Sequence, residues 1–523
     1  MFRAAAYRVL TFTARPPTTS TKLYYSTSLS QMGAPEAGYI ESLRQKLQEV
    51  TPTRFYFKQG TIKILYAPDG FYKTLLSKIS SAKRRVFIAS LYLGKTETEL
   101  VDCVSDALSR NPDLKVYFLL DGLRGTREYP RTSSATLLST LVEKFGDERV
   151  DCRFYRTPVF RGWKKTVIPR RFNEGLGLQH MKIYGVDDEV ILSGANLSND
   201  YFSDRQDRYY IFQNGAFADY QFQLHRTVSS LSYRLKARRD LEEKFELVWP
   251  ASNKAVEPQL NKSKFLQTSS ERLDKFLHTT TPSETRHHDK NELYPTVVYP
   301  ISQFTPLFRR NHDRSTELPS VVSMLSMVDE PGTKIDWTFT AGYFNMLPSI
   351  KHRLLNSQSS HGTVITASPY ANGFYRSKGV SRHLPDAYLH LAHKFVRSVE
   401  RRGKSDSIAL MEWRRGTANE PGGWSYHAKG IWLAGVGAKP HTCTPFATII
   451  GSSNYTKRAY SLDLESDAIV VTTDPELRRE MQGEVQHLLE DTKRVTLDDF
   501  NRDSDRYVSA GVKLATSILG KRL

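Results

Sequence analysis

Two stretches of the chain repeat one set of chemically active side chains. Each has a His and a Lys two positions apart, then an Asn, then an acidic residue eleven positions after that Asn. The first set is His180, Lys182, Asn196 and Asp207, and the second is His427, Lys429, Asn454 and Glu465. Residues two apart on a strand point to the same face, so each His–Lys pair is expected to face one site.

These residue types suit phosphoryl transfer without a metal. One imidazole can attack phosphorus and form a phospho-histidine, while a second donates and later removes a proton. Lysines and Asn amides can hold the phosphoryl oxygens, and a carboxylate on the far ring nitrogen fixes each His tautomer. Attack and proton transfer come from opposite sides of phosphorus, so neither set is complete alone. Which acid pairs with which His is left open by the spacing.

The pattern His-x-Lys-x4-Asp followed by Gly/Ser-x-Asn resembles the phospholipase D superfamily, with one motif in each half of the chain. The first motif fits through His180, Lys182 and Asp187, whereas Ala434 stands at the Asp position of the second. The resemblance implies that Asp187 belongs to the site. We expect His180, in the complete motif, to be the nucleophile and His427 to be the general acid and then base. Residues 435–445 are expected to form an inserted loop.

Two runs of sequence narrow the resemblance. Residues 170–184 and 196–202 are similar to the mitochondrial phosphatidylglycerophosphate synthase family. That family transfers a phosphatidyl group from CDP-diacylglycerol to glycerol 3-phosphate, with CMP as leaving group, in the first step of phosphatidylglycerol and cardiolipin synthesis. The resemblance implies no cofactor, no metal and no nucleic-acid partner. It also implies a membrane-associated enzyme at the matrix side of the mitochondrial inner membrane. Two in-line displacements predict retention of configuration at phosphorus.

The composition is typical of a folded enzyme that binds anionic partners. The chain has 523 residues, 39% of them hydrophobic, which is enough for two domains of roughly 200 residues each. Its three cysteines have no metal-ligand spacing. The net charge of +18 favours anionic partners such as a membrane surface or phosphorylated metabolites. Residues 1–31 contain Arg, Ser and Thr but no acid, which is typical of a mitochondrial presequence. No apolar run is long enough to span a bilayer.

Alternating strand-like and helix-like runs predict an α/β fold of two fused phospholipase D-like domains. Each domain is expected to be a mixed sheet flanked by helices, with one shared active site at the interface. The run from Ala216 to Glu246 is read as helical. The predicted organisation is presequence 1–31, N-terminal domain 38–250, polar linker 251–293, C-terminal domain 294–502 and tail 503–523. The tail carries an apolar stripe at helical spacing, which predicts an amphipathic helix that either packs on the domain or anchors it to a membrane.

Further residues are candidates for ligand binding on weaker grounds. A loop after a strand holds Arg124, Arg127 and Arg131, which could bind the phosphate of glycerol 3-phosphate. Arg170 and Arg171 belong to a basic and aromatic cluster that would suit lipid headgroups. Gly94, Lys95 and Thr96 end a relaxed phosphate-loop string, although phosphatidyl transfer needs no ATP.

Three alternative functions remain open at this level. One is a phosphatidyltransferase with another acceptor, such as serine or phosphatidylglycerol. Another is a phospholipase D-type phosphodiesterase that uses water on phospholipid or nucleic acid. The third is a lipid-binding scaffold without catalysis. CMP release that depends on the acceptor would distinguish them.

Overall fold

The computed structural model describes residues 34–127, 132–160, 162, 173–279, 293–500 and 506–519. The predicted presequence lies outside the described residues, as do Arg131, Arg170 and Arg171.

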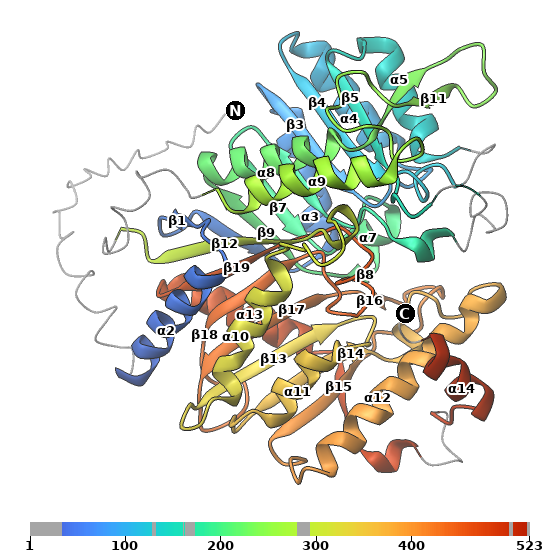
Figure 1. Ribbon diagram of the computed structural model, residues 1–523. Helices are drawn as coiled ribbons and strands as arrows, with labels where there is room; N and C mark the ends of the chain where they lie inside the picture. The colour runs from blue at the N-terminus through green and yellow to red at the C-terminus, as the bar shows by residue number, and fades with distance from the viewer. Residues whose placement is uncertain are drawn as a thin grey trace, which may run out of the picture.

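Two nine-stranded mixed sheets form the framework of the molecule (Figure 1). The first contains, in spatial order, β11 (Phe245–Val248), β10 (Tyr233–Ala237), β5 (Val150–Tyr155), β4 (Lys115–Asp121), β3 (Arg85–Ser90), β6 (Ile183–Val186), β7 (Glu189–Ser193), β9 (Tyr209–Gln213) and β2 (Ile62–Leu65). The second contains β20 (Thr492–Val495), β15 (Ile408–Trp413), β14 (Gly362–Ala367), β13 (Ile335–Ala341), β17 (Lys429–Gly435), β18 (Pro445–Gly451), β19 (Glu465–Thr472), β12 (Thr296–Gln303) and β1 (Phe55–Phe57).

The two sheets share one pattern. Strands β10 to β2 of the first match β20 to β12 of the second, position by position and in every parallel or antiparallel pairing. Each sheet adds one further strand, β11 in the first and β1 in the second. The duplication seen in the motifs is therefore a duplication of the fold, and the predicted pair of α/β domains is confirmed.

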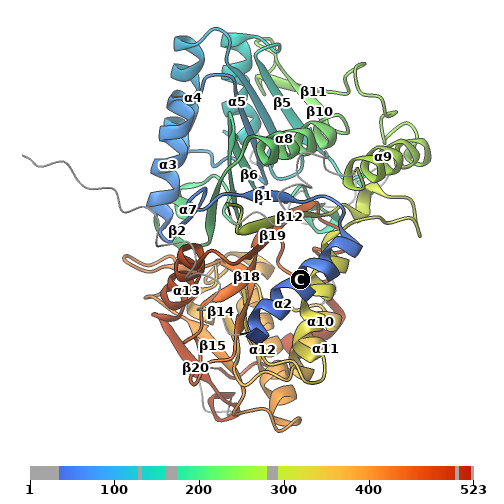
Figure 2. The ribbon, with the colours of Figure 1, turned by 90° about the vertical axis from the view of Figure 1, so that its left-hand side faces the viewer.

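Helices link and cover the strands of each half (Figures 1 and 2). Those of the first half are α3 (Pro68–Ser80), α4 (Thr98–Arg110), α5 (Ser134–Phe145), α7 (Asn199–Ser203), α8 (Gly215–Ser229) and α9 (Lys262–Leu277). Those of the second half are α10 (Glu317–Asp329), α11 (Pro348–Asn356), α12 (Leu384–Glu400), α13 (Pro475–Leu489) and α14 (Ala510–Leu519).

The predicted helix from Ala216 to Glu246 is wrong beyond Ser229. The chain turns at a Ser-rich segment and forms the antiparallel pair β10–β11 instead. In β10, Tyr233 and Leu235 are buried while Lys236 is exposed, which is the two-residue period of a strand. The apolar residues that suggested a helix there are therefore the inward face of a strand.

The domain boundaries differ from those expected at the N-terminus. Helix α2 (Ala34–Val50) packs on α10, and β1 pairs with β12, so both belong to the second half (Figure 2). The predicted linker also holds a packed helix, α9, whose residues Phe265, Leu273 and Leu277 are buried. These apolar positions lie one or two turns apart within a polar composition, which concealed them.

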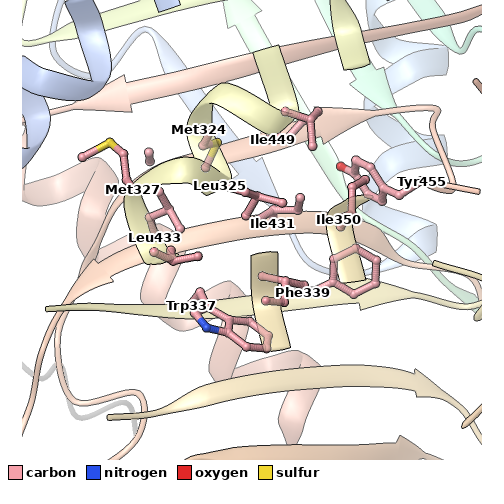
Figure 3. Close-up of a cluster of buried hydrophobic side chains, with 14 of the residues drawn as sticks. Met324, Leu325, Met327, Trp337, Phe339, Ile350, Ile431, Leu433, Ile449 and Tyr455 are labelled. Carbon is pink, nitrogen blue, oxygen red and sulfur yellow. The ribbon is translucent and has the colours of Figure 1, made fainter. Parts of the chain in front are cut away.

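Buried apolar clusters hold each half and join them. In the second half, α10 and α11 contribute Met324 and Ile350 to a core with Trp337, Ile431 and Leu433 of the sheet (Figure 3). A separate cluster contains side chains from both sheets, among them Leu192 and Tyr210 of the first and Ile450 and Val470 of the second. This shared cluster fixes the two halves against one another.

Candidate active site

The two half-sites exchange backbone pairing. Gln179, which precedes His180, bridges in parallel to Leu464, which precedes Glu465. In the same way β16 (Ser425–Tyr426), just before His427, pairs with β8 (Arg205–Gln206), just before Asp207. The His180 amide donates to Leu464 at 2.9 Å, and the His427 amide donates to Gln206 at 2.8 Å. Each catalytic segment of one half is thus placed beside the acidic segment of the other.

The side chains follow this crossed arrangement. His180 Nδ1 lies 3.0 Å from both carboxylate oxygens of Glu465, and His427 Nδ1 lies 2.6 Å from Asp207 Oδ2. A carboxylate on Nδ1 fixes the tautomer that carries its proton there. That leaves Nε2 of each ring for chemistry. His427 Nε2 lies 3.3 Å from the Tyr201 hydroxyl, whereas His180 Nε2 has no hydrogen-bond partner within the described chain.

Both lysines of the motifs are buried beside the histidines. Lys182 Nζ donates to the His180 carbonyl at 2.6 Å, and Lys429 Nζ lies 2.8 Å from His427 Nδ1 and 3.3 Å from Asp207 Oδ2. Asn196 and Asn454 each have a buried side-chain oxygen without a partner. A buried amide end that no protein group satisfies is available to a ligand, and rotation of the amide would present its NH₂ group.

Close contacts explain why glycine stands at two positions beside the site. A side chain on Gly194 would place its first carbon 2.3 Å from Lys429 Nζ and 2.5 Å from Asp207 Oδ1. On Gly177, which has φ +120°, the same carbon would lie 2.2 Å from the Leu462 carbonyl. Only Gly permits this close approach of the two halves at the site.

Burial sets the protonation of both histidines. Burial and the neighbouring Lys182 hold the pKa of His180 well below its ordinary value. Burial and Lys429 lower the pKa of His427 to about 3. Lys429 of the second half also depresses the pKa of His180, so the two half-sites share one electrostatic environment. Both rings are therefore neutral near pH 7, as a nucleophile and a base require.

The acids and lysines differ between the halves. Burial raises the pKa of Glu465 to about 7. Burial acts on Asp207 in the same direction, but Lys429 and His427 outweigh it and keep the pKa of Asp207 below its ordinary value. Burial lowers the pKa of Lys182 to about 7. An anionic ligand would raise the pKa of both lysines and both histidines.

The structure does not bring Asp187 to this cluster. It lies in the turn between β6 and β7, at φ 51°, and its carboxylate accepts hydrogen bonds from the backbone amides of Lys83, Arg84 and Arg85. Lys182 and Asp187 are separated by the length of β6, roughly 16 Å along the strand. Asp187 therefore ties the β6–β7 turn to the start of β3. Ala434, at the equivalent sequence position, lies within β17 and not in a turn, where it pairs with Asp336 and Pro445. The loop between β17 and β18 spans residues 436–444, slightly shorter than expected.

Several residues of the site were not predicted. Tyr201 accepts from Asn196 Nδ2 at 3.0 Å and meets His427, while Tyr343 packs edge-on against the His427 ring. Arg205 stacks over Tyr201 at 4.5 Å and pairs with Asp200. Tyr201 lies in the run 196–202 that carried the resemblance, but no residue pattern marked its contact with the second half.

One buried ion pair joins the halves behind the site. Arg208 donates to Glu484 at 2.8 Å and 3.0 Å, and to the carbonyls of Lys429 and Ile449. Its guanidinium also stacks over Trp432 at 3.9 Å. Arg208 follows Asp207 directly, so this pair holds the backbone that presents the acid of His427.

Four of the weaker ligand-binding candidates line a surface cavity of about 270 Å³: Gly94, Lys95, Thr96 and Arg124. The amides of Gly94, Glu97 and Thr98 are already hydrogen bonded, to Leu197, Gly94 and Thr96 respectively. A phosphate loop needs such amides to be free, so these bonds agree with the interpretation that the string is a pattern match only. Arg124 stacks on Tyr92 at 4.1 Å, and Arg127 lies in the same turn.

The described residues contain neither a candidate membrane span nor a candidate metal site. None of their helices is both long enough and apolar enough to cross a membrane. No group of three or more of their His, Cys, Asp or Glu side chains is arranged to hold a metal ion.

Comparison with known proteins identifies relatives along nearly the whole chain. It is 55% identical over 491 residues to a CDP-diacylglycerol–glycerol-3-phosphate 3-phosphatidyltransferase of Saccharomyces pastorianus, covering 94% of this chain and 93% of that one. A Mus musculus protein with that name and the word mitochondrial is 33% identical, covering 91% and 85%. Among solved structures, phosphatidylserine synthase of Haemophilus influenzae matches with a TM-score of 0.68 at 17% identity, covering 92% and 98%, which shows a common fold. No family model matches the chain.

Proposed function

The chain belongs to the CDP-diacylglycerol–glycerol-3-phosphate 3-phosphatidyltransferase family, and we propose that it performs this transfer through a covalent intermediate on His180. The crossed pairing of the two histidines carries the proposal. Each ring is held by a carboxylate on Nδ1, so that two Nε2 atoms serve one reaction from the two halves of the chain.

In the first step, His180 Nε2 attacks the phosphorus that bears diacylglycerol. An N–P bond forms, and the P–O bond to CMP breaks. CMP is a good leaving group, so this step demands little proton donation. The low pKa of His180 keeps its lone pair available, and Glu465 on Nδ1 stabilises the positive charge that develops on the ring.

In the second step, glycerol 3-phosphate takes the place that CMP has left. His427 removes the proton of the attacking hydroxyl, the new P–O bond forms, and the N–P bond to His180 breaks. Neutral His427, with Asp207 on Nδ1, is suited to this role because the carboxylate stabilises the imidazolium that results. An anionic phosphoryl group nearby raises the pKa of His427, which lets it carry a proton toward CMP in the first step.

Lys182, Lys429, Asn196 and Asn454 bind the phosphoryl oxygens in this scheme. The lysines neutralise the charge of the transition state. The side-chain oxygens of both Asn residues have no partner, so rotation of each amide would present its NH₂ group to a phosphoryl oxygen. The chemistry requires neither a metal ion nor ATP. Asp187 takes no part in it.

We place the reaction in the mitochondrion, at the matrix surface of the inner membrane. Relatives from Mus musculus and Homo sapiens have the word mitochondrial in their names, and residues 1–31 have presequence composition. The partners are CDP-diacylglycerol, glycerol 3-phosphate and an anionic membrane surface, without nucleic acid.

CMP release from CDP-diacylglycerol in detergent micelles tests the proposal, with chelator present and no ATP. Wild type should turn over repeatedly only with glycerol 3-phosphate and release at most about one CMP per active site without it. His180→Ala should release none, and the exposed His312→Ala should match wild type. Continued release over many turnovers without acceptor would indicate a hydrolase. Inversion of configuration at phosphorus would exclude the phospho-histidine route.

A further inference from the structure

The tail of the chain exposes an apolar stripe. Of the six large apolar side chains that are exposed in the described residues, three lie here: Tyr507 at 48%, Leu514 at 65% and Ile518 at 69%. Leu514 and Ile518 are one helical turn apart on α14, and Tyr507 lies in the segment just before this helix. On the other side Val508 and Thr516 are buried, and α14 contacts α12. The tail is therefore docked on the fold by one side and open on the other.

The surroundings of this stripe are positively charged. The sequence of residues 506–523 contains two Arg and two Lys and no Asp or Glu, and Asp503 and Asp505 precede it. Arg506 is paired with Glu412, so its charge is neutralised within the fold. Lys513 lies 5.4 Å from the Tyr507 ring. Besides burial, its charge lowers the pKa of His390 together with that of Lys394, and the pKa of His393 together with that of Arg397. An apolar stripe with flanking cations is the arrangement by which a helix lies in the headgroup region of an anionic bilayer.

The helix on which α14 packs, α12, is connected to the catalytic site through one aromatic side chain. Tyr388 of α12 stacks on Tyr343 at 5.5 Å, and Tyr343 packs against the His427 ring at 5.3 Å. Figure 1 shows α14 beside α12. Helix α12 therefore lies between α14 and the catalytic site, so a membrane bound by α14 would be close to the site.

We propose that α14 docks this enzyme on an anionic lipid surface, with Tyr507, Leu514 and Ile518 inserted among the headgroups. The proposal rests on the proposed function for its lipid substrate. A second copy of the chain fits less well, because the three side chains expose roughly 350 Å², against about 800 Å² per partner in a stable protein interface. The sequence from residue 506 to residue 523, which has no acidic side chain, also favours an anionic surface.

Sedimentation with vesicles tests this inference on the full chain. The vesicles contain phosphatidylcholine and phosphatidylglycerol at about four to one, with pure phosphatidylcholine as the comparison. The variant is Leu514→Gln with Ile518→Gln. The control is Ala515→Gln with Ser517→Gln, which adds the same two side chains to exposed positions of α14 and removes no large apolar group.

The Leu514 and Ile518 variant should lose about tenfold or more in affinity for anionic vesicles, and the control should stay within about threefold of wild type. Wild type should bind neutral vesicles more weakly. Both variants should release CMP in detergent at the wild-type rate, while the first should be slow on vesicles. Equal vesicle binding by all three proteins would overturn the docking proposal, as would a change of oligomeric state in the first variant. Loss of turnover by wild type in detergent would instead overturn the proposed function.

Discussion

Asp207→Asn should separate the two half-reactions of this enzyme. The substitution removes the charge that lies 2.6 Å from His427 Nδ1 and 3.3 Å from Lys429 Nζ. It leaves His180 and its partner Glu465 unchanged, because the pairing is crossed. The matched variant is Glu465→Gln, which makes the equivalent change beside His180.

The hydrogen bond to the charged carboxylate sets the upper limit of the effect, because Asn replaces it with a neutral acceptor. A hydrogen bond to a charged group is worth about 1.5–3 kcal/mol, which corresponds to a rate loss of about 10- to 150-fold where that bond stabilises the transition state. Asp207 also raises the pKa of His427, so its removal makes that base weaker still. Deprotonation of the glycerol 3-phosphate hydroxyl depends on this base, whereas CMP leaves with little help. The second step should therefore slow by about 10- to 150-fold, and the first by much less.

Rapid-quench measurement of CMP at enzyme concentrations near those of the substrate separates the steps. Asp207→Asn should release a burst of about one CMP per active site and then turn over slowly, with an acid-labile phosphatidyl group on the protein. Glu465→Gln should show no burst, because attack by His180 is itself impaired. Wild type should show a smaller burst, since both steps are fast.

The reverse pattern would refute this reasoning. A burst in Glu465→Gln but not in Asp207→Asn would make His427 the nucleophile. Equal slowing without a burst in both variants would mean that the acids hold the site together and do not act on separate steps. Label found on a residue other than His180 would exclude the assignment directly.

Three further outcomes are expected. The pKa of Lys182 is lowered to about 7, so its ammonium loses its proton as the pH rises through that value. The kcat/KM of wild type should therefore fall above about pH 7. Lys182→Arg, whose guanidinium stays charged, should lack this fall at alkaline pH. Asp187→Ala should keep kcat within about threefold in the folded protein but lower the free energy of unfolding by about 1–3 kcal/mol in urea titrations, because three backbone amides lose their acceptor. Arg208→Met should lower the free energy of unfolding by about 3–5 kcal/mol, because it leaves the Glu484 carboxylate buried without its charge partner. The double variant Arg208→Met with Glu484→Leu should recover most of that free energy in the same titrations.

Much of the fold could be predicted from local patterns. The parallel strands and their linking helices in both halves have periodic apolar residues, and the repeat of the motifs indicated the repeat of the sheets. The predictions of secondary structure that were wrong concern segments whose local sequence pattern is ambiguous. The segment after Ser229 has apolar residues that suit either a helix or a strand, and only pairing with β5 decides for a strand. Helix α9 was concealed because its buried positions are few and its composition is polar.

Asp187 shows the limit of transferring a motif. Its spacing from His180 placed it in the catalytic pattern, but a strand of this length carries it to the far end of the sheet, where it binds backbone amides. Tyr201 is the opposite case. Nothing in its sequence context marks a contact with His427, because that contact crosses from one half to the other.

The sequence by itself determined which side chains are available for phosphoryl transfer, since a repeated His, Lys, Asn and acid set at fixed spacing is a property of the chain. It also determined that two such sets must meet, because each lacks a partner for the opposite side of phosphorus. Only the tertiary structure decided that Glu465 serves His180 and Asp207 serves His427. That choice depends on backbone pairing between segments more than 200 residues apart, which local propensity does not specify.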